Sequence, residues 1–444
     1  MTETENLTLL APVKITEPPE IIGLKRTSTK FVRKFLLDDI TSVKNLQQLI
    51  EYQYQLRQNL LNSGLFKSVN VASNTFANND FDSIDKEWVK IQVTVEEKSK
   101  ISGNIGMDTS VQNPEKLEPK LELTFPNLFG KGESLSFHTN KDPNMAINAK
   151  NPLEKVTPDS YRLNFTKPIV TDKGVFSPIS KVDLSCENNF EQCDWLSANL
   201  RNRLVNLNLG LAGNLKFSHS LGYQFAWKHL TLQSPTDDDK KQSTPVDIRV
   251  REKLGHSQKS SISYNMRYST LKNNIYGIAA QGYQLTNNLE LAGIGLDGSK
   301  FVKCGFNGQL ALTPMGNLTF HALFKMGFLE GSSIPIQDKF FLGGNMDLRG
   351  YEFNTASNKT GGNRLAALGL HAYHPITSGL NLHLFAQSGS VFNELQKREF
   401  NRHLKSSVGV GLAANFSGIS LEANVIKASD RDMRFGVGFG FSSL

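Results

Sequence analysis

The sequence predicts a membrane all-β protein, in which one small β-α-α-β-β domain precedes a 16-stranded antiparallel transmembrane β-barrel. From residue 101 to residue 444, apolar and polar side chains alternate with the period of two that is typical of a β-strand. The polar positions are mostly Asn, Ser, Gly, Gln and Thr, whereas a soluble sheet would present many Lys and Glu residues to water. In lipid, only a closed sheet satisfies every backbone amide of such strands, so a barrel is favoured over a soluble sandwich.

The composition excludes several other classes of protein. The chain has 444 residues, of which 39% are apolar and 20% charged, a balance that fits neither a helical membrane bundle nor a disordered chain. Its charge-free stretches, such as 365–393, are interrupted by Asn, Gln, His, Pro and Gly, whereas a spanning helix requires roughly 20 mostly apolar residues. The net charge of +7 is a mild excess that supports contact with anionic surfaces, and we expect no nucleic-acid partner.

The sequence offers no assignable catalytic or metal site. It contains no HExxH or CxxC spacing, and no Ser-His-Asp, Cys-His or paired-carboxylate arrangement that can be defended. Its three cysteines are too few for a disulfide framework, and we expect reduced thiols, although Cys186 and Cys193 could face each other across a loop. We therefore expect no metal, no cofactor and no enzymatic activity.

The N-terminal part differs from the rest of the chain. Residues 1–18 are expected to be a flexible segment, and residues 19–100 a small domain with one core between two helices and a three-stranded sheet. The longer helix would have Ser42 as its N-cap, Gly64 as its C-cap and Ile50 on its apolar face. The expected elements, in β-α-α-β-β order, cover 20–24, 30–37, 43–63, 66–73 and 87–97.

Residues 101–444 form the predicted barrel. In one segment, Leu382 and Leu384 point to one face of the strand, while His383 and Gln387 point to the other. Sixteen such segments leave about 21 residues for each strand with its connection, as expected for strands of about ten residues joined by alternating short turns and longer loops. The segments begin near 101, 117, 132, 160, 180, 198, 215, 258, 276, 297, 316, 362, 379, 404, 418 and 432.

One loop motif resembles that of a known family. Residues 340–353, FFLGGNMDLRGYEF, match the pattern aromatic-x-Gly-Gly followed by Arg-Gly-aromatic. This pattern is similar to the conserved loop of the outer-membrane protein insertase superfamily, which lies between the eleventh and twelfth of sixteen barrel strands, as it does in our strand count. The matching residues are Gly343, Gly344, Arg349, Gly350 and Tyr351.

Further segments extend this resemblance along nearly the whole chain. The domain at 19–100 resembles one polypeptide-transport-associated (POTRA) domain, 125–137 (FPNLFGKGESLSF) resembles the early barrel segment of the family, and 255–261 (GHSQKSS) its middle. Residues 369–375 (GLHAYHP) fit the mitochondrial branch, the barrel subunits of the sorting and assembly machinery. The first twenty residues lack the apolar run of a secretory signal, so we expect no cleaved leader, in agreement with that branch.

The resemblance implies that the motif loop folds back into the barrel lumen. Arg349 would then need a counterion, because an unpaired buried charge is costly. Alternation makes Glu422 the candidate partner, since the residues on either side of it would face lipid. Gln387 stands where bacterial relatives carry Asp, so a neutral amide contact is expected there, and the inward-facing His371 could either donate to the loop or be a satisfied wall residue. A solvated Arg349 on an exposed loop remains the alternative.

The first and last barrel strands are candidates for a seam that opens. Both are rich in glycine, which weakens packing and permits bending, although the same glycines could line a crowded lumen. The last strand, 434–441, also fits the mitochondrial β-signal, polar-x-Gly-x-x-apolar-x-apolar. The residues concerned are Ile101, Gly103, Ile105 and Gly106 on the first strand, and Arg434, Gly436, Phe439 and Phe441 on the last.

These residues and the resemblance together predict insertion and assembly of β-barrel precursor proteins into the mitochondrial outer membrane, by β-signal pairing at a lateral gate between the first and last strands. We expect an integral protein with its N-terminal domain in the intermembrane space, where that domain could capture clients, dock partners or act as a spacer. The expected partners are β-barrel precursors, metaxin-type receptor subunits, a cristae-organising complex and the lipid bilayer. The alternatives are a passive or protein-secreting barrel channel and a soluble all-β scaffold protein.

Overall fold

A computed structural model defines the architecture of the chain. It describes residues 13–15, 18–35, 43, 45–76, 87–109, 117–140, 160–168, 181–212, 216–232, 248–273, 278–295, 298–315, 317–344, 347–377, 379–393, 397–416 and 419–441. Ser42, expected as a helix N-cap, lies outside these described residues, as does most of the segment 1–18.

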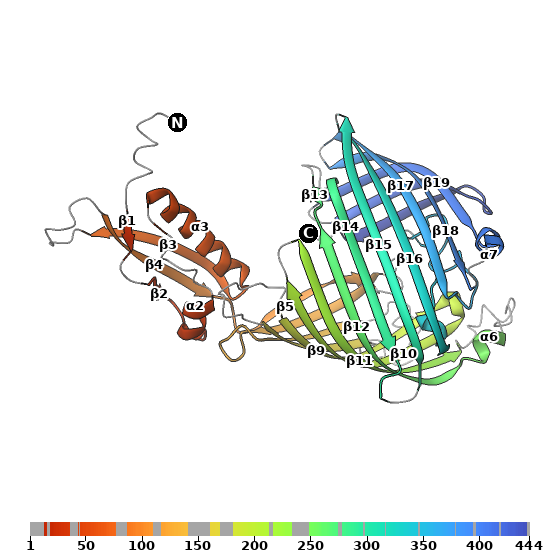
Figure 1. Ribbon diagram of the computed structural model, residues 1–444, viewed down its shortest axis with the longest axis horizontal. Coiled ribbons are helices and arrows are strands. Elements are labelled where there is room, and N and C mark those ends of the chain that lie inside the picture. The colour runs from red at the N-terminus through yellow and green to blue at the C-terminus, as the bar shows by residue number, and fades with distance from the viewer. Residues whose placement is uncertain are drawn as a thin grey trace.

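The N-terminal domain combines two helices with a four-stranded sheet, and lies beside one end of the barrel (Figure 1). Its central strand is β4: β3 pairs antiparallel along one edge, and β1 and β2 pair parallel with successive parts of the other edge. Alternate residues of β4, such as Ile91 and Val93, are fully buried against apolar side chains of both helices. The elements are β1 (Val13–Ile15), β2 (Glu20–Ile22), α2 (Thr29–Phe35), α3 (Leu46–Asn62), β3 (Phe66–Phe76) and β4 (Glu87–Glu97).

Strand β1 corrects the expected domain boundary. It lies within residues 1–18, which were expected to be a flexible segment, and it adds a fourth strand to the expected three. Val13 pairs with Glu87 of β4, and its side chain is buried in the domain core. Three residues are too short to give a sequence signal, so pairing with a distant strand determines this element.

Helix α3 begins and faces the core differently from the sequence expectation. Asn45 is the N-cap, because its Oδ1 accepts the backbone N–H of Gln48 at 2.8 Å. Ile50 is exposed rather than buried, and Tyr52 lies in the core instead. The C-terminus agrees with the prediction, since Gly64 has a φ of 74° and follows the helix as a C-cap.

The rest of the chain is a closed antiparallel barrel, as predicted. Each strand pairs with its neighbours in sequence, and the sheet order places β21 beside β5; the two-residue β13 continues β12, which leaves sixteen long strands. Every expected strand start lies within about three residues of the observed one. The strands are β5 (Ser102–Thr109), β6 (Leu117–Pro126), β7 (Ser134–Asn140), β8 (Ser160–Pro168), β9 (Lys181–Cys193), β10 (Ala198–Ala212), β11 (Phe217–Leu232), β12 (Gly255–Ser269), β13 (Lys272–Asn273), β14 (Ala279–Ala292), β15 (Lys300–Met315), β16 (Leu318–Ser333), β17 (Arg364–Thr377), β18 (Leu380–Phe392), β19 (Lys405–Phe416), β20 (Ile419–Ala428) and β21 (Arg434–Phe441).

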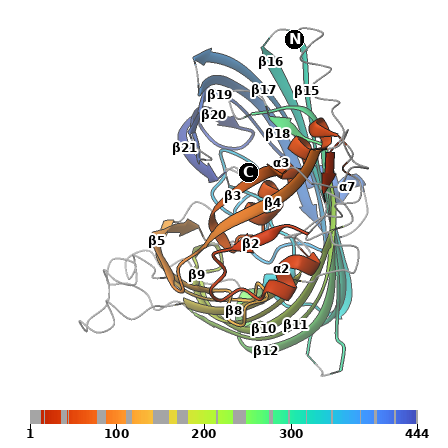
Figure 2. The same ribbon diagram turned by 90° about the vertical axis from the view of Figure 1, so that its left-hand side faces the viewer.

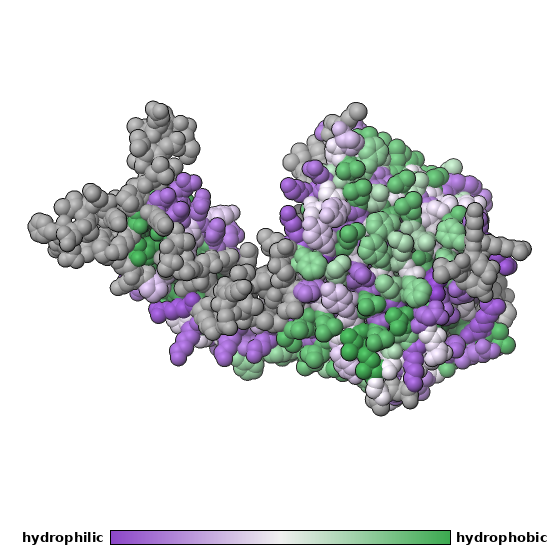
Figure 3. Space-filling view, in the orientation of Figure 1, coloured by the Kyte–Doolittle hydropathy of each residue, from purple (hydrophilic) through white to green (hydrophobic). Residues whose placement is uncertain are grey.

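The barrel has a polar lumen and an apolar outer wall. On β18, Asn381, His383 and Gln387 are buried inside, whereas Leu384 is exposed on the outside. Hydrophobic residues accordingly cover much of the outer face over β15 to β17 (Figure 3). A soluble β protein has the opposite arrangement, with its apolar side chains in a dry core. The alternative of a soluble all-β scaffold is therefore wrong.

Short helical turns occur between some of the strands. No helix among the residues that the structure describes is long and apolar enough to cross a membrane. The short helices are η3 (Asp194–Leu196), α6 (Ile248–Arg251), η5 (Ile336–Asp338) and α7 (Lys397–Arg402).

The cysteine positions exclude the disulfide considered from the sequence. Cys186 and Cys193 lie on the same strand, β9, and both are free. Seven residues of extended strand span roughly 23 Å, far beyond the reach of a disulfide. The segment between them is a continuous strand rather than a loop, so the two thiols cannot face each other.

Candidate functional site in the lumen and at the strand seam

The long connection between β16 and β17, residues 334–363, contains the Gly-Gly and Arg-Gly motif and is called the lumen loop here. It lies between the eleventh and twelfth long strands, as predicted. Its apolar residues Leu342, Leu348 and Tyr351 are buried in one cluster with wall residues of the barrel. The chain therefore folds back against the inner wall here, and Arg349 is buried rather than solvated.

Two glycines of the motif permit this compact path. Gly343 has a φ of 128°, and a Cβ there would lie 2.4 Å from the carbonyl oxygen of Glu352. Gly350 has a φ of 86°, and a Cβ there would lie 2.9 Å from Cγ2 of Ile426 on β20. The second glycine thus lets the loop backbone approach the wall directly beside Arg349.

Arg349 contacts both residues that the sequence analysis assigned to it. Its Nη2 donates to Oε2 of Glu422 at 2.7 Å and its Nε donates to the same oxygen at 3.2 Å. Its backbone N–H donates to Oε1 of Gln387 at 2.9 Å. The guanidinium also lies 5.1 Å from the ring centroid of Phe385, within cation–π range. The charge is therefore compensated by one carboxylate on β20, while the amide on β18 holds the backbone N–H of the same residue.

His371 contacts the wall rather than the loop backbone. Its Nδ1 lies 2.9 Å from Nε2 of His383, and its Nε2 lies 3.3 Å from Nε2 of Gln387. His383 in turn stacks on Tyr373 and lies 3.9 Å from Glu422. This ladder of rings supports the two residues that hold Arg349. Within the described residues, no group of three His, Cys, Asp or Glu side chains is placed to hold a metal ion.

A second anchor of the lumen loop was missed by the sequence analysis. Asp338, at the end of η5, is buried and accepts from Nζ of Lys228 at 2.8 Å and from Nζ of Lys259 at 3.2 Å. Lys303 donates to the backbone oxygen of Asp338 at 2.7 Å, and Lys259 also pairs with Glu290 at 2.8 Å. These side chains come from β11, β12, β14 and β15. In the sequence, the feature that could have indicated them was an inward-facing charged residue on each of these four strands.

The lumen loop also reaches the last strands of the barrel. The Tyr351 hydroxyl donates to Asp430, in the turn between β20 and β21, and Asp430 also accepts from Lys405. Arg434, the first residue of β21 and of the predicted β-signal, lies with its Nη1 3.6 Å from Oε1 of Glu352. Both members of this last pair are exposed, so it contributes at most about 1 kcal/mol. The loop is therefore linked weakly to the strand that borders the seam.

The seam is the border between β5 and β21, and two of its outward side chains are more exposed than interior ones, whereas Val437 on β21 is 50% exposed, as interior residues are. Ile105 on β5 is 83% exposed and Phe435 on β21 is 71% exposed. By contrast, Leu384 and Val410, which are paired in register between β18 and β19, are 49% and 44% exposed. A strand with tight neighbours on both sides shields its outward side chains more, so the seam provides less lateral cover around Ile105 and Phe435. Figure 2 shows β5 and β21 on the same side of the barrel.

The glycines expected at the seam lie there, with contacts from one side. Among described atoms, a Cβ at Gly106 would meet only Lys120 of β6 within 4 Å, and one at Gly436 only Ile426 of β20. The crowded-lumen alternative is therefore not supported at Gly106, whereas at Gly436 the Ile426 side chain, 3.0 Å from such a Cβ, crowds the lumen side. Ile101 directly precedes β5, and Gly103 is its second residue. Phe439 and Phe441, whose side chains are outside the described part, have backbones in β21 paired with β20.

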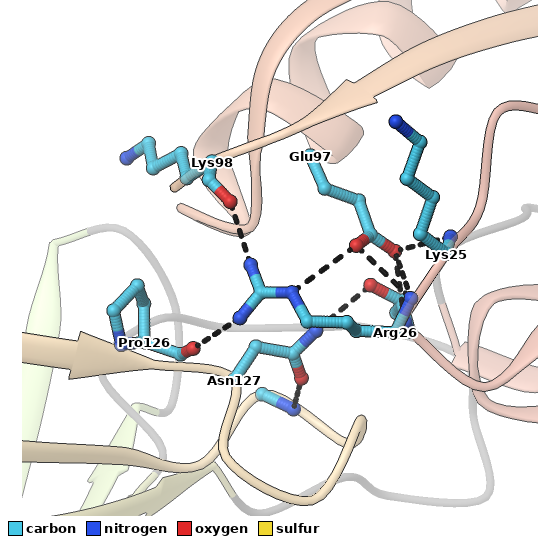
Figure 4. A network of polar contacts seen from close by, with 8 residues as sticks. Lys25, Arg26, Glu97, Lys98, Pro126 and Asn127 are labelled. Atoms are coloured by element: carbon cyan, nitrogen blue, oxygen red, sulfur yellow. Dashed lines mark hydrogen bonds and ion pairs between the residues drawn. The ribbon is translucent and has the colours of Figure 1, made fainter. Parts of the chain in front are cut away.

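A polar joint, also missed by the sequence analysis, connects the N-terminal domain to the barrel beside the seam (Figure 4). Arg26 donates to the backbone oxygens of Lys98, at 2.6 Å, and of Pro126 on β6, at 3.2 Å. Asn127, in the turn between β6 and β7, donates to the Thr27 hydroxyl at 2.8 Å. Since residues 98–101 connect β4 directly to β5, the joint positions the N-terminal domain next to the first barrel strand.

Glu97 organises the domain side of this joint. Its carboxylate accepts the backbone N–H groups of Lys25, Arg26 and Thr27 at 2.8 to 3.1 Å, and it lies 3.5 Å from Nε of Arg26. Burial raises the pKa of this carboxyl, but the hydrogen bonds from Thr27, Arg26 and Lys25 outweigh burial and lower the pKa to about 2. The group is therefore ionised at neutral pH and fixes the segment that carries Arg26.

A closed 16-stranded barrel with a polar lumen, an inserted Arg-Gly loop and one N-terminal α/β domain defines a class of outer-membrane β-barrel protein. Residues 127–442 match the model of the Omp85 superfamily domain. The chain belongs to the Omp85 superfamily.

Comparisons with individual proteins agree. The human sorting and assembly machinery component 50 homolog is 25% identical over 91% of this chain and 86% of its own length. A Drosophila melanogaster SAM50-like protein is 22% identical over 95% of this chain and 93% of its own length. Among solved structures, BamA from Haemophilus ducreyi lacking POTRA domains 1-3 has a TM-score of 0.70 and 15% identity, and covers 96% of this chain and 84% of that one. The chain is thus similar over most of its length to SAM50 homologues, and it shares its fold with BamA.

Proposed function

We propose that this protein inserts and assembles β-barrel precursor proteins into the mitochondrial outer membrane, by pairing the β-signal of a client with a strand edge exposed at the seam between β5 and β21. A strand edge supplies backbone partners before a client strand reaches lipid, where unpaired amides are costly. The observation that carries the proposal is the contrast in lateral cover between the seam residue Ile105 and the interior residue Leu384.

The bracing of the barrel also supports a gate at this border. The lumen loop holds Lys228 of β11 through Asp338 and Glu422 of β20 through Arg349, so the wall from β11 to β20 is braced from inside. Its link to β21 is the exposed pair of Arg434 and Glu352. Among the side chains that the structure describes, opening at the seam would therefore break one weak contact of the loop and leave its two buried anchors in place.

Arg349, Gly343, Gly344, Gly350 and Tyr351 would keep the lumen loop in one conformation, with Glu422, Gln387 and His371 as its wall partners. The N-terminal domain, which we propose is POTRA-like and lies in the intermembrane space, would hold its sheet beside the first gate strand. The names of the relatives describe components of a sorting and assembly machinery, which supports action within a complex. Metaxin-type receptor subunits and a cristae-organising complex remain predicted partners.

A reversible covalent lock tests the proposal. Ile105→Cys and Val437→Cys are combined in a chain whose three native cysteines are replaced, and a matched control combines Leu384→Cys with Val410→Cys, an interior pair already in register. Assembly of a radiolabelled barrel precursor is followed in isolated mitochondria before and after oxidation. We expect oxidation to block assembly in the seam pair alone, and reduction to restore it. Unchanged assembly in a fully locked protein would overturn the proposal.

The same experiment separates the remaining alternative, a passive or protein-secreting channel. In such a channel the cargo would use the lumen, and the seam would stay closed during function. Locking Ile105 to Val437 would then leave transport through the lumen unchanged. Crosslinking of an arrested precursor to residues 101–109 and 434–441, but not to β18 or β19, would favour the gate.

A further inference from the structure

The outer wall of the barrel carries an apolar hollow across β15 to β20. Its cavity volume is about 720 Å³, within the roughly 300–1,000 Å³ of typical ligand pockets. The cause is an alternation of side-chain size across the strands. Ala322 and Ala386 are each paired in register with Leu370, and Ala372 with Phe320 and Leu384. Short side chains therefore lie among long ones on the outward face, and the wall is indented there.

One cation lies at the edge of this hollow. Lys427 lines it, is exposed on the outward face, and is the second-last residue of β20. The nearby carboxylate of Asp430 is already engaged by Lys405 and Tyr351, and Glu422 is engaged by Arg349 inside the lumen. Within the part of the chain that the structure describes, no carboxylate pairs with Lys427.

The position of Lys427 fits the depth of lipid headgroups. The side chain stands near the end of a spanning strand, where a lysine can extend its ammonium to the membrane surface while its methylene groups lie along apolar wall. Near a bilayer surface, each such cation attracts anionic lipids by about 1 kcal/mol. The hollow below it is lined almost wholly by apolar groups, including Val408 and Val425. The hollow and Lys427 together would accommodate a molecule with an apolar chain and an anionic end.

We infer that the hollow is a specific phospholipid site, in which the phosphate of an anionic lipid contacts Lys427 and an acyl chain fills the indentation over Ala322 and Ala386. A membrane phospholipid is favoured over a protein segment because the site faces the bilayer of an integral outer-membrane protein and ends in Lys427, a cation that pairs with no described carboxylate. Nothing in this inference depends on how clients are inserted, so it goes beyond the proposed gate.

The site also adjoins the last strand of the barrel. Met433, directly before β21, lines the hollow, and Val425 is paired in register with Phe435 of β21. A lipid bound there lies against β20 beside the seam, on the membrane side. Its acyl chain would cover outward side chains that the adjoining strands leave exposed.

Lipid retention by the full-length protein tests the inference. The chain is reconstituted in vesicles of phosphatidylcholine and phosphatidylglycerol in equal parts and extracted in mild detergent, and the bound phosphatidylglycerol is counted by native mass spectrometry. Lys427→Glu removes the cation, and Ala386→Leu fills the hollow. The matched controls are Lys167→Glu, an exposed lysine at the second-last position of β8, and Ala366→Leu, an outward alanine of β17 outside the hollow. Heat-modifiable migration on gels verifies that each variant is folded.

We expect Lys427→Glu to lower phosphatidylglycerol retention about fivefold, and Ala386→Leu to lower retention of both lipids, while both controls match the natural protein. Equal retention in all five proteins would overturn the site. Equal loss in Lys427→Glu and Lys167→Glu would also overturn it, because attraction would then be general to surface charge. A photocrosslinker at position 386 that captures a protein rather than lipid in mitochondrial membranes would assign the hollow to a different occupant.

Discussion

Two groups of barrel strands are held in place by different parts of the chain. The wall from β11 to β20 is braced from the lumen, through Asp338 at one end and Arg349 at the other. The turn between β6 and β7 is instead held from outside, through Arg26 and Asn127 at the joint with the N-terminal domain. The border between β21 and β5 lies where these two kinds of bracing meet. A sheet can therefore be closed and still have one border at which opening disturbs few side-chain contacts.

Removal of the lumen anchor gives the largest expected effect. Arg349→Ala leaves Glu422 largely buried without its cation, which costs about 3–5 kcal/mol of folding free energy. We expect the barrel band on a semi-native gel to unfold at a markedly lower temperature. In the charge-swapped protein, Arg349→Glu with Glu422→Arg, part of the loss should be recovered. A double variant no better folded than either single variant would show that the pair does not hold the loop.

Two inward-facing glycines sharpen the contrast between wall and seam. At Gly411 on β19, a Cβ would lie 2.1 Å from the carbonyl oxygen of Ala423, so Gly411→Ala should destabilise the barrel by about 1–3 kcal/mol. At Gly106 on β5, the nearest described atom is Cε of Lys120 at 3.7 Å, and Gly106→Ala should change stability by only about 0.5 kcal/mol. Urea unfolding in micelles measures both. Equal destabilisation would contradict the difference in packing between the two regions.

The joint on the outer side gives a smaller effect than the wall, and a dependence on pH. Because the pKa of Glu97 is lowered from 4.5 to about 2, its contribution to stability is complete above pH 4.5 and is lost as the pH falls toward 2. Glu97→Gln should weaken the joint by about 1 kcal/mol and remove this pH dependence. Distances between spin labels on the N-terminal domain and on the barrel, measured from pH 6 to pH 3, would show whether the joint loosens as Glu97 is protonated.

The neighbouring carboxylate provides the control. Glu96 is exposed and pairs only across the surface, with Lys67 and Ser68, so Glu96→Gln should leave the distance distribution unchanged. If both glutamine variants broaden the distribution alike, the effect belongs to net charge and not to the hydrogen bonds at Glu97.

Much of the candidate site could be predicted because its members lie in patterned or motif-bearing segments. Glu422 was identified by alternation along β20, and Arg349 by the loop motif, and the structure brings them to 2.7 Å. Asp338 could not be found in this way, because its partners Lys228 and Lys259 are on separate strands and meet only through the register of the closed sheet. The joint at Arg26 could not be predicted for a similar reason. Arg26 belongs to no sequence motif, and its partner, the backbone oxygen of Pro126, lies far along the chain.

The sequence by itself determined the strands, their apolar and polar faces, and hence a barrel in lipid, because the two-residue period is a local property that each strand carries alone. The resemblance of the loop motif to that of a known family further implied which loop enters the lumen. The tertiary structure alone decided that β1 joins β4, that three lysines converge on Asp338, and that alanines on β16, β17 and β18 together indent the outer wall. Such contacts form between residues on different strands, which are brought together by the closure of the barrel and the register of its sheet. No short stretch of sequence determines which residues these are.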